Sequence, residues 1–218
     1  MATIDQISAR ARQALFARLP QTDDVLPRIP VGDAACHVKT SGDLKANFLA
    51  TAAANKFQVH SCTQAELLNT VNSLLAQHAV KSLLCSADLP FALSELNGVE
   101  PLVFDRPLEE MREQVFGADA ALCVGTAGAS SSGNVLCASS PQAPRCLTLV
   151  PPILVLLLPE SRLVASPEAA INLALKSGAH PANLVFTAGP ARTADIELIT
   201  IFGAHGPHTV ELVVYGED

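Results

Sequence analysis

From Ser41 onward, short apolar runs alternate with stretches in which apolar residues recur every three or four positions. Apolar runs of four to eight residues are typical of buried strands, and the three-to-four-residue recurrence is typical of helices that bury one face. Strands that alternate with helices form parallel sheets, because each parallel connection has to cross back over the sheet. The pattern therefore predicts a single α/β domain over residues 36–218, with a mostly parallel sheet flanked by helices.

The same pattern gives approximate bounds for the elements. Strands are predicted at 56–60, 81–85, 101–105, 118–124, 135–138, 146–150, 152–158, 183–189 and 209–215. Helices are predicted at 41–55, 63–75, 90–96, 107–115 and 166–176. Ser41 is the expected N-cap of the first helix, and Thr63 with Glu66 has the spacing of a capping box.

The N-terminal residues form a separate segment. Residues 3–18 carry apolar positions at helical spacing, and residues 19–35 contain Pro20, Pro27 and Pro30, which block regular structure. We expect a helical arm with a proline-rich tether over 1–35. The arm packs either on its own domain or on a partner subunit, in which case the protein is a homo-oligomer.

Composition narrows the class of protein. Hydrophobic residues make up 49% and charged residues 16%, with a net charge of −7. An acidic chain without clustered Lys or Arg is not suited to binding nucleic acid or anionic membranes. The longest apolar run, 147–158, is too short to span a bilayer and contains two prolines, and the first residues lack a signal-peptide pattern. A cytoplasmic location without a membrane span is expected.

The cysteines do not predict a cofactor in this chain. The six are widely spaced, without a C-x-x-C motif or a zinc or iron–sulfur ligand pattern: Cys36, Cys62, Cys85, Cys123, Cys137 and Cys146. Most have apolar neighbours, which favours reduced thiols that pack in the core. Cys36 and His37 are adjacent, but neighbours on a strand point to opposite faces, so they are a poor nucleophile and base pair.

A cluster of polar residues near the C-terminus is the main candidate for chemistry. Between two Gly-Pro pairs the chain carries Arg192, Thr193, Asp195, Glu197 and His205. We expect a helix that begins near Thr193, with the acids in its first turn and Arg192 placed to bind a carboxylate or phosphate. His205, between glycines, would face the same crevice. The alternative is an ion-pair network that only stabilises the turn.

A loop of small residues at 125–134 is a second candidate. Its backbone N–H groups could reach a phosphate or carboxylate without obstruction by side chains, at Ser132, Gly133 and Asn134 in particular. It matches neither the P-loop nor the dinucleotide-binding motif, so it does not by itself indicate a nucleotide. A plain hairpin loop is the alternative.

These segments resemble a known family. The sequence Gly-Pro-Ala-Arg-Thr-Ala-Asp-Ile-Glu at 189–197, with Gly-Ala-His-Gly-Pro at 203–207, is similar to the signature of the LUD (lactate utilization) domain family. The resemblance covers roughly residues 40–218. It implies a fold like that of the NagB/RpiA/CoA transferase superfamily. It also implies a role in oxidising L-lactate to pyruvate beside iron–sulfur partner proteins, which would hold the clusters.

The resemblance leaves the chemistry of this chain open. Ser131 stands where the family pattern has an acid, which favours an accessory subunit with a small-anion pocket over a catalyst. The other hypotheses are a free-standing enzyme that acts on a phosphorylated, CoA-linked or folate-linked small molecule, and a scaffold without a pocket. Fold analogy does not decide between these, because one fold supports many reactions.

Overall fold

The computed structural model describes Gln13, Ala14, Ala17 and residues 42–104, 106–141, 143–176, 181–194, 200–203 and 205–216. The predicted arm and tether over 1–35 therefore fall almost wholly outside the described residues. Ser41, Asp195 and Glu197 lie outside them as well.

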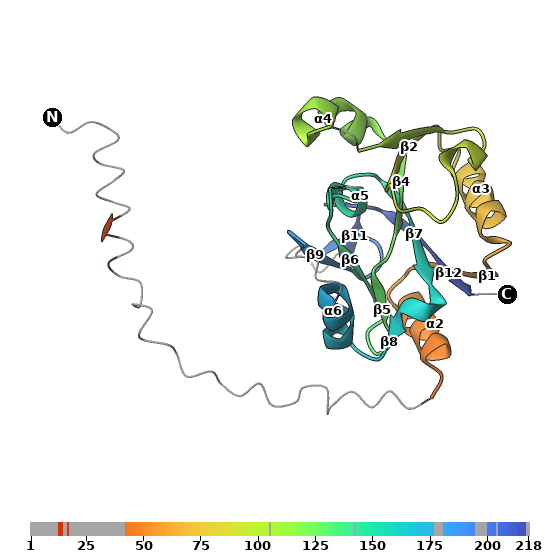
Figure 1. The fold of residues 1–218 in the computed structure, drawn as a ribbon, viewed down its shortest axis with the longest axis vertical. Coiled ribbons are helices and arrows are strands. Elements are labelled where there is room, and N and C mark those ends of the chain that lie inside the picture. The colour runs from red at the N-terminus through yellow and green to blue at the C-terminus, as the bar shows by residue number, and fades with distance from the viewer. Residues whose placement is uncertain are drawn as a thin grey trace. The chain divides into compact units, whose positions relative to one another are not determined.

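Six parallel strands form the central sheet (Figure 1). Every pair of neighbours in it is parallel, which confirms the predicted architecture. In spatial order the strands are β1 (Gln58–Thr63), β12 (Thr209–Gly216), β7 (Ile153–Pro159), β4 (Ala120–Val124), β2 (Ser82–Cys85) and β3 (Glu100–Val103).

Both faces of this sheet are buried. Leu154, Leu156 and Leu158 of β7 pack on one side, and Val155 and Leu157 pack on the other. The first side is covered by α2 (Leu44–Ala54), α4 (Leu108–Gly117) and the short α5 (Cys146–Leu149). The second is covered by α3 (Leu67–Gln77) and the 3-10 helix η2 (Leu93–Glu95). Burial on both faces explains why β7 is continuously apolar rather than alternating.

The crossover connections between strands of the central sheet have the same handedness. The links from β1 to β2 and from β2 to β3 pass over the α3 face, whereas those from β3 to β4 and from β4 to β7 pass over the opposite face. Connections that lead along the sheet toward β3 therefore lie on one face, and connections that lead toward β1 lie on the other. This is what right-handed crossovers require, because reversing the direction of a crossover moves it to the other face.

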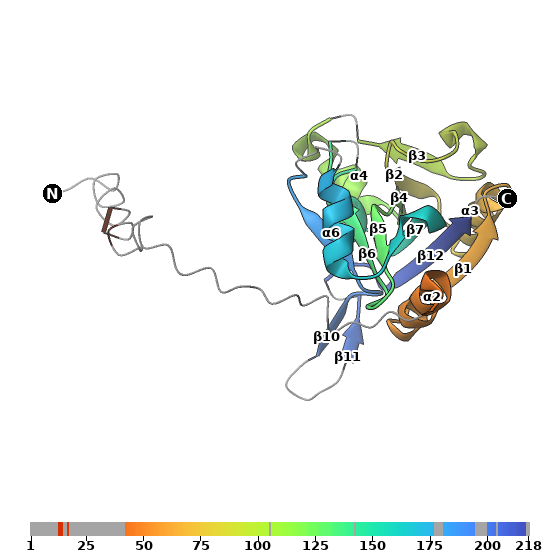
Figure 2. The same cartoon turned by 60° about the horizontal axis from the view of Figure 1, so that its bottom comes forward.

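A second, mostly antiparallel sheet lies beside the first (Figure 2). Its strands in spatial order are β8 (Leu163–Val164), β5 (Ala127–Ala129), β6 (Asn134–Ala138) and β9 (Leu184–Thr187), and α6 (Pro167–Lys176) packs on it. Part of the predicted loop 125–134 is therefore strand β5. Its small residues allow close packing, since a Cβ on Gly128 would lie 2.6 Å from Leu158 and 2.8 Å from Leu163.

Two element predictions were wrong. Residues 146–149 form helix α5 instead of a strand, because an apolar run this short has no periodicity that distinguishes the two. The helix expected near Thr193 is an antiparallel hairpin of β10 (Arg192–Ala194) and β11 (Thr200–Phe202). Here β-branched residues pair across the strands, with Thr193 opposite Ile201.

The helix starts follow local hydrogen bonds. The Thr63 amide donates to the Glu66 carboxylate at 3.0 Å, and the Glu66 amide donates to the Thr63 hydroxyl at 3.3 Å. This reciprocal pair closes the turn before α3, whose N-cap is Glu66 rather than the expected Thr63. The carboxylate of Asp43 caps α2 by accepting from the amides of Lys45 and Ala46. Asp43, rather than the expected Ser41, is thus the cap.

Gly133 offers a test of the contact between the second sheet and α2. Its φ is +67°, and an added Cβ would lie 2.4 Å from the Thr51 carbonyl carbon. Gly98 is the matched control, because its φ is +71° with nothing within 4 Å. We expect Gly98→Ala to lower the free energy of unfolding by about 1–2 kcal/mol from backbone strain alone. Gly133→Ala should lower it by clearly more in urea titrations, and equal losses would contradict this packing.

Candidate functional site

Arg192 and His205, two of the residues that the sequence singled out, line the same cavity. Its volume is about 290 Å³. The walls come from the end of α5, from β9 and the turn after it, and from the loop before β12: Thr148, Leu149, Val185 to Arg192, and His205 to Pro207. Two backbone hydrogen bonds of 2.8 Å hold the walls together, from the Ala191 amide to the Pro207 carbonyl and from the Gly203 amide to the Ala191 carbonyl.

The cavity is suited to an anion. Arg192 and His205 are both exposed, and the Arg192 guanidinium donates to the Ala188 carbonyl at 3.2 Å. None of the described lining residues is an Asp or Glu. A guanidinium that faces no described carboxylate retains donors for a bound carboxylate or phosphate. Thr193 is half-buried on β10 and is not among the lining residues.

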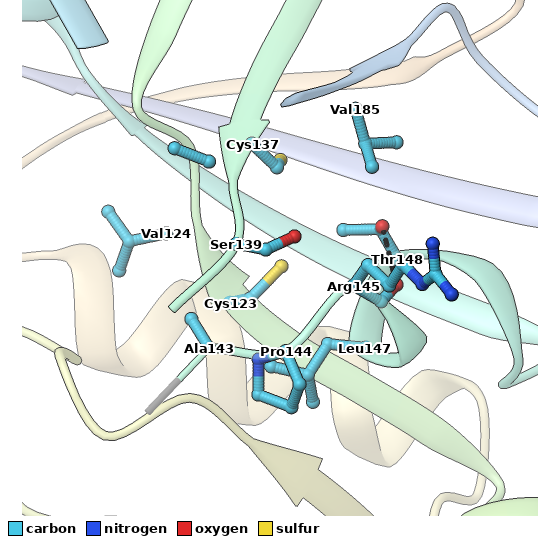
Figure 3. Close-up of a pocket in the computed structure, with 11 residues that line it drawn as sticks. Cys123, Val124, Cys137, Ser139, Ala143, Pro144, Arg145, Leu147, Thr148 and Val185 are labelled. Carbon is cyan, nitrogen blue, oxygen red and sulfur yellow. Dashed lines mark hydrogen bonds between the residues drawn. The ribbon is translucent and has the colours of Figure 1, made fainter. Parts of the chain in front are cut away.

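A smaller cavity adjoins the first (Figure 3). Thr148 and Val185 line both, and Arg145 lines the smaller one. Its volume is about 10 Å³, which is close to the space that one water molecule needs. The Arg145 guanidinium donates to the Asn183 side chain at 3.3 Å, and the Arg145 carbonyl accepts from the Thr148 hydroxyl at 3.0 Å. Arg145 thus lines the smaller cavity and Arg192 the larger, and Thr148 and Val185 are walls of both.

The loop residues Ser132, Gly133 and Asn134 lie elsewhere. They are not among the described residues that line this cavity, and the Ser132 and Gly133 amides both donate to the Ala129 carbonyl. The Asn55 side chain of α2 donates to the Ser132 carbonyl at 2.7 Å. The turn thus holds the second sheet on α2. Ser131 belongs to the same turn, so the residue at that position does not shape the Arg192 cavity.

The described cysteines are free thiols, of which Cys85, Cys123 and Cys146 are buried and Cys62 and Cys137 are half-buried. Cys123 and Cys137 meet at the wall of the smaller cavity (Figure 3). The hydrogen bond that the Cys123 thiol donates to Cys137, together with burial, raises the pKa of Cys123 well above its usual value. Burial raises the pKa of Cys85 to about 12. Protonated, buried thiols are poor nucleophiles, which agrees with the packing role expected from the sequence.

One polar cluster was missed by the sequence analysis. Glu211 is fully buried in β12, and its carboxylate oxygens are 2.6 Å from Nε2 of His60 and 2.7 Å from Nε2 of His78. Each carboxylate oxygen is thus within hydrogen-bond distance of one histidine ring nitrogen. The visible signal is a lone acid within the apolar strand Thr-Val-Glu-Leu-Val-Val-Tyr.

The Glu211 cluster ties three elements together. His60 lies on β1, Glu211 on β12 and His78 at the C-terminal end of α3. A buried carboxylate is costly without hydrogen-bond partners, and here both oxygens have one. None of the three residues lines the Arg192 cavity. We interpret the cluster as a structural connection between the edge strand, its neighbour and α3.

The described residues contain neither a group of metal ligands nor a helix that could cross a membrane. Their His, Cys, Asp and Glu side chains do not form a group of three or more that could hold a metal ion. Within the same residues, every helix is too short or too polar to cross a membrane.

The fold is that of an α/β domain, and Arg192 and His205 line a cavity at the end of its packed layers. The comparison with known families then identifies the domain: the LUD domain profile matches residues 46–215. The chain belongs to the LUD domain family.

Several known proteins are similar to part of this chain. The chain is 32% identical over 124 residues to an uncharacterized protein of Neisseria meningitidis serogroup B, which covers 56% of this chain and 53% of that protein. It is 33% identical over 110 residues to lactate utilization protein C of an Exiguobacterium species, with 49% and 48% covered. The matches thus span about half the length of these relatives.

A solved structure shares the fold. The crystal structure of a DUF162 family protein from Deinococcus radiodurans superposes with a TM-score of 0.58 at 16% identity. The match covers 79% of this chain and 96% of that chain. At this identity the likeness supports the architecture alone.

The Glu211 cluster gives a stability prediction. Glu211→Ala leaves two partly buried histidine ring nitrogens without their hydrogen-bond partner, and each unsatisfied buried polar group typically costs about 1–3 kcal/mol, so the two together cost about 2–6 kcal/mol. We expect a loss near the lower limit, because His60 remains a third exposed. Glu160→Ala is the control, since its 2.7 Å pair with Lys45 is partly exposed and worth about 1 kcal/mol or less. Urea denaturation of both variants checks this, and similar losses would contradict a structural role for Glu211.

Proposed function

We propose that this protein is an accessory subunit in lactate utilization and that it binds a small carboxylate in the Arg192 cavity. The observation that carries the proposal is the convergence of Arg192 and His205 on one cavity without a described carboxylate. The similarity to proteins named lactate utilization protein C supports the role.

The size of the cavity favours a small ligand. Sites for drug-sized molecules usually occupy about 300–1,000 Å³, and this cavity has about 290 Å³. An α-hydroxy or α-keto acid places its carboxylate against the guanidinium, and its hydroxyl or keto oxygen within reach of the His205 ring. A neutral imidazole can donate or accept, so it accommodates either oxygen. These residues bind and orient the ligand, and the proposal assigns no chemical step to them.

Ligand binding is tested by titration calorimetry with L-lactate, pyruvate and inorganic phosphate. Loss of a charged hydrogen bond typically costs about 1.5–3 kcal/mol, so Arg192→Ala should weaken carboxylate binding roughly tenfold or more. Arg112→Ala is the control, because Arg112 is exposed on α4 with its guanidinium over the Phe116 ring, and neither residue lines the cavity. Equal affinities of the two variants would contradict the site.

A second assay, which measures thermal shifts, separates the accessory role from the alternative enzyme hypothesis. Sugar phosphates, acyl-CoAs and folates are added in a thermal-shift panel, where a ligand at 100 times its Kd stabilises the fold by about 2.7 kcal/mol. Stabilisation by one of these, without any by lactate or pyruvate, would replace the accessory role with a free-standing enzyme.

The accessory role predicts iron–sulfur partners, because this chain is proposed to work beside proteins that hold the clusters. Affinity purification of the tagged protein from lactate-grown cells should recover proteins with bound iron and labile sulfide. Cells grown without lactate are the control. Recovery of the chain alone, together with normal growth on lactate after deletion of its gene, would refute the role.

A further inference from the structure

The open edge of β1 is a surface that the proposed function does not use. β1 is the outermost strand of the central sheet and pairs only with β12 among the described residues (Figure 2). An edge strand presents a row of unpaired N–H and C=O groups that readily pair with another strand. Proline, lysine or a bulge usually protects such an edge. The sequence Gln-Val-His-Ser-Cys-Thr has no proline or lysine, and its register with β12 is unbroken.

The surface beside the edge is almost free of charge. A groove of about 550 Å³ runs between β1 and α3. Glu66 is the only acid or permanently charged residue among those that line it; the others are His60, Ser61, Cys62, Asn69, Thr70, Ser73, Leu74 and Gln77. Two identical chains of net charge −7 repel least where such neutral surfaces meet, and interface cores are typically depleted of charged residues.

We propose that two copies of this chain pair through β1, antiparallel about a twofold axis, so that their central sheets join. A strand that pairs with itself satisfies both partners with the same residues, as twofold interfaces require. Opposite residues in an antiparallel pair share a face of the sheet. With Ser61 opposite its own copy, His60 faces Cys62 and Val59 faces Thr63. This register places no like charges opposite each other and keeps the two His60 rings apart.

A charge-swap experiment tests the pairing. Ser61 is exposed, so Ser61→Lys and Ser61→Glu should leave the fold intact, as circular dichroism verifies. Light scattering coupled to size exclusion should give twice 22.8 kDa for the unaltered chain and 22.8 kDa for each variant alone. Each variant alone should be a monomer because the two introduced side chains carry like charges and face each other across the twofold axis. An equimolar mixture of the two variants should restore the dimer, because opposite charges now face each other.

Ser94→Lys is the matched control, since Ser94 is exposed on η2 and adds the same charge away from β1. It should remain dimeric. The proposal fails if the unaltered chain is a monomer at tens of micromolar, or if Ser61→Lys stays dimeric. It also fails if mixing the Lys and Glu variants does not restore the dimer. A monomer whose β1 amides are protected from hydrogen exchange would show that another part of the chain covers the edge.

Discussion

Burial of both faces of the parallel sheet is the constraint on which the rest of this structure depends. The middle of β7 is apolar on both sides, so helices or a second sheet must cover each face. The hand of the crossovers then decides which connection covers which face. α3 and η2 belong to the connections that lead toward β3, and they cover one face of the sheet. The connections that lead toward β1 cover the other face, and the second sheet is part of them. The positions of both polar sites follow from this division.

The second sheet supplies part of the wall of the Arg192 cavity. It approaches the central sheet closely because its first strand consists of Ala127, Gly128 and Ala129, and a side chain on Gly128 would collide with Leu158. β9 at its far edge then runs past α5, and the turn after β9 meets the loop before β12. The loop of small residues, which the sequence suggested as a ligand cradle, therefore has an indirect role. It packs the sheets, and Arg192 and His205 lie where the packed layers end.

Much of this fold could be predicted because it depends on local signals. Alternation of strands and helices indicated the parallel sheet, and Thr63 and Glu66 form the expected reciprocal hydrogen bonds in the turn before α3. Of the residues that the sequence singled out, Arg192 and His205 line one cavity, and their role in binding stays a prediction. The β10–β11 hairpin was missed because Thr193 suits a helix cap and a strand equally, and cross-strand pairing decided between them. Glu211 was missed because its partners, His60 and His78, are far away in the sequence.

The contrast between the two polar sites explains why one is interpreted as structural and the other as a binding site. Glu211 is fully buried, and each of its carboxylate oxygens has a histidine ring nitrogen as its partner, so these contacts are made inside the fold. Arg192 is exposed, and the partner found for it among the described residues is a neutral carbonyl. A guanidinium there has donors left for an anion from solution. Saturated polar contacts hold elements together, whereas unsaturated and exposed ones remain available to ligands.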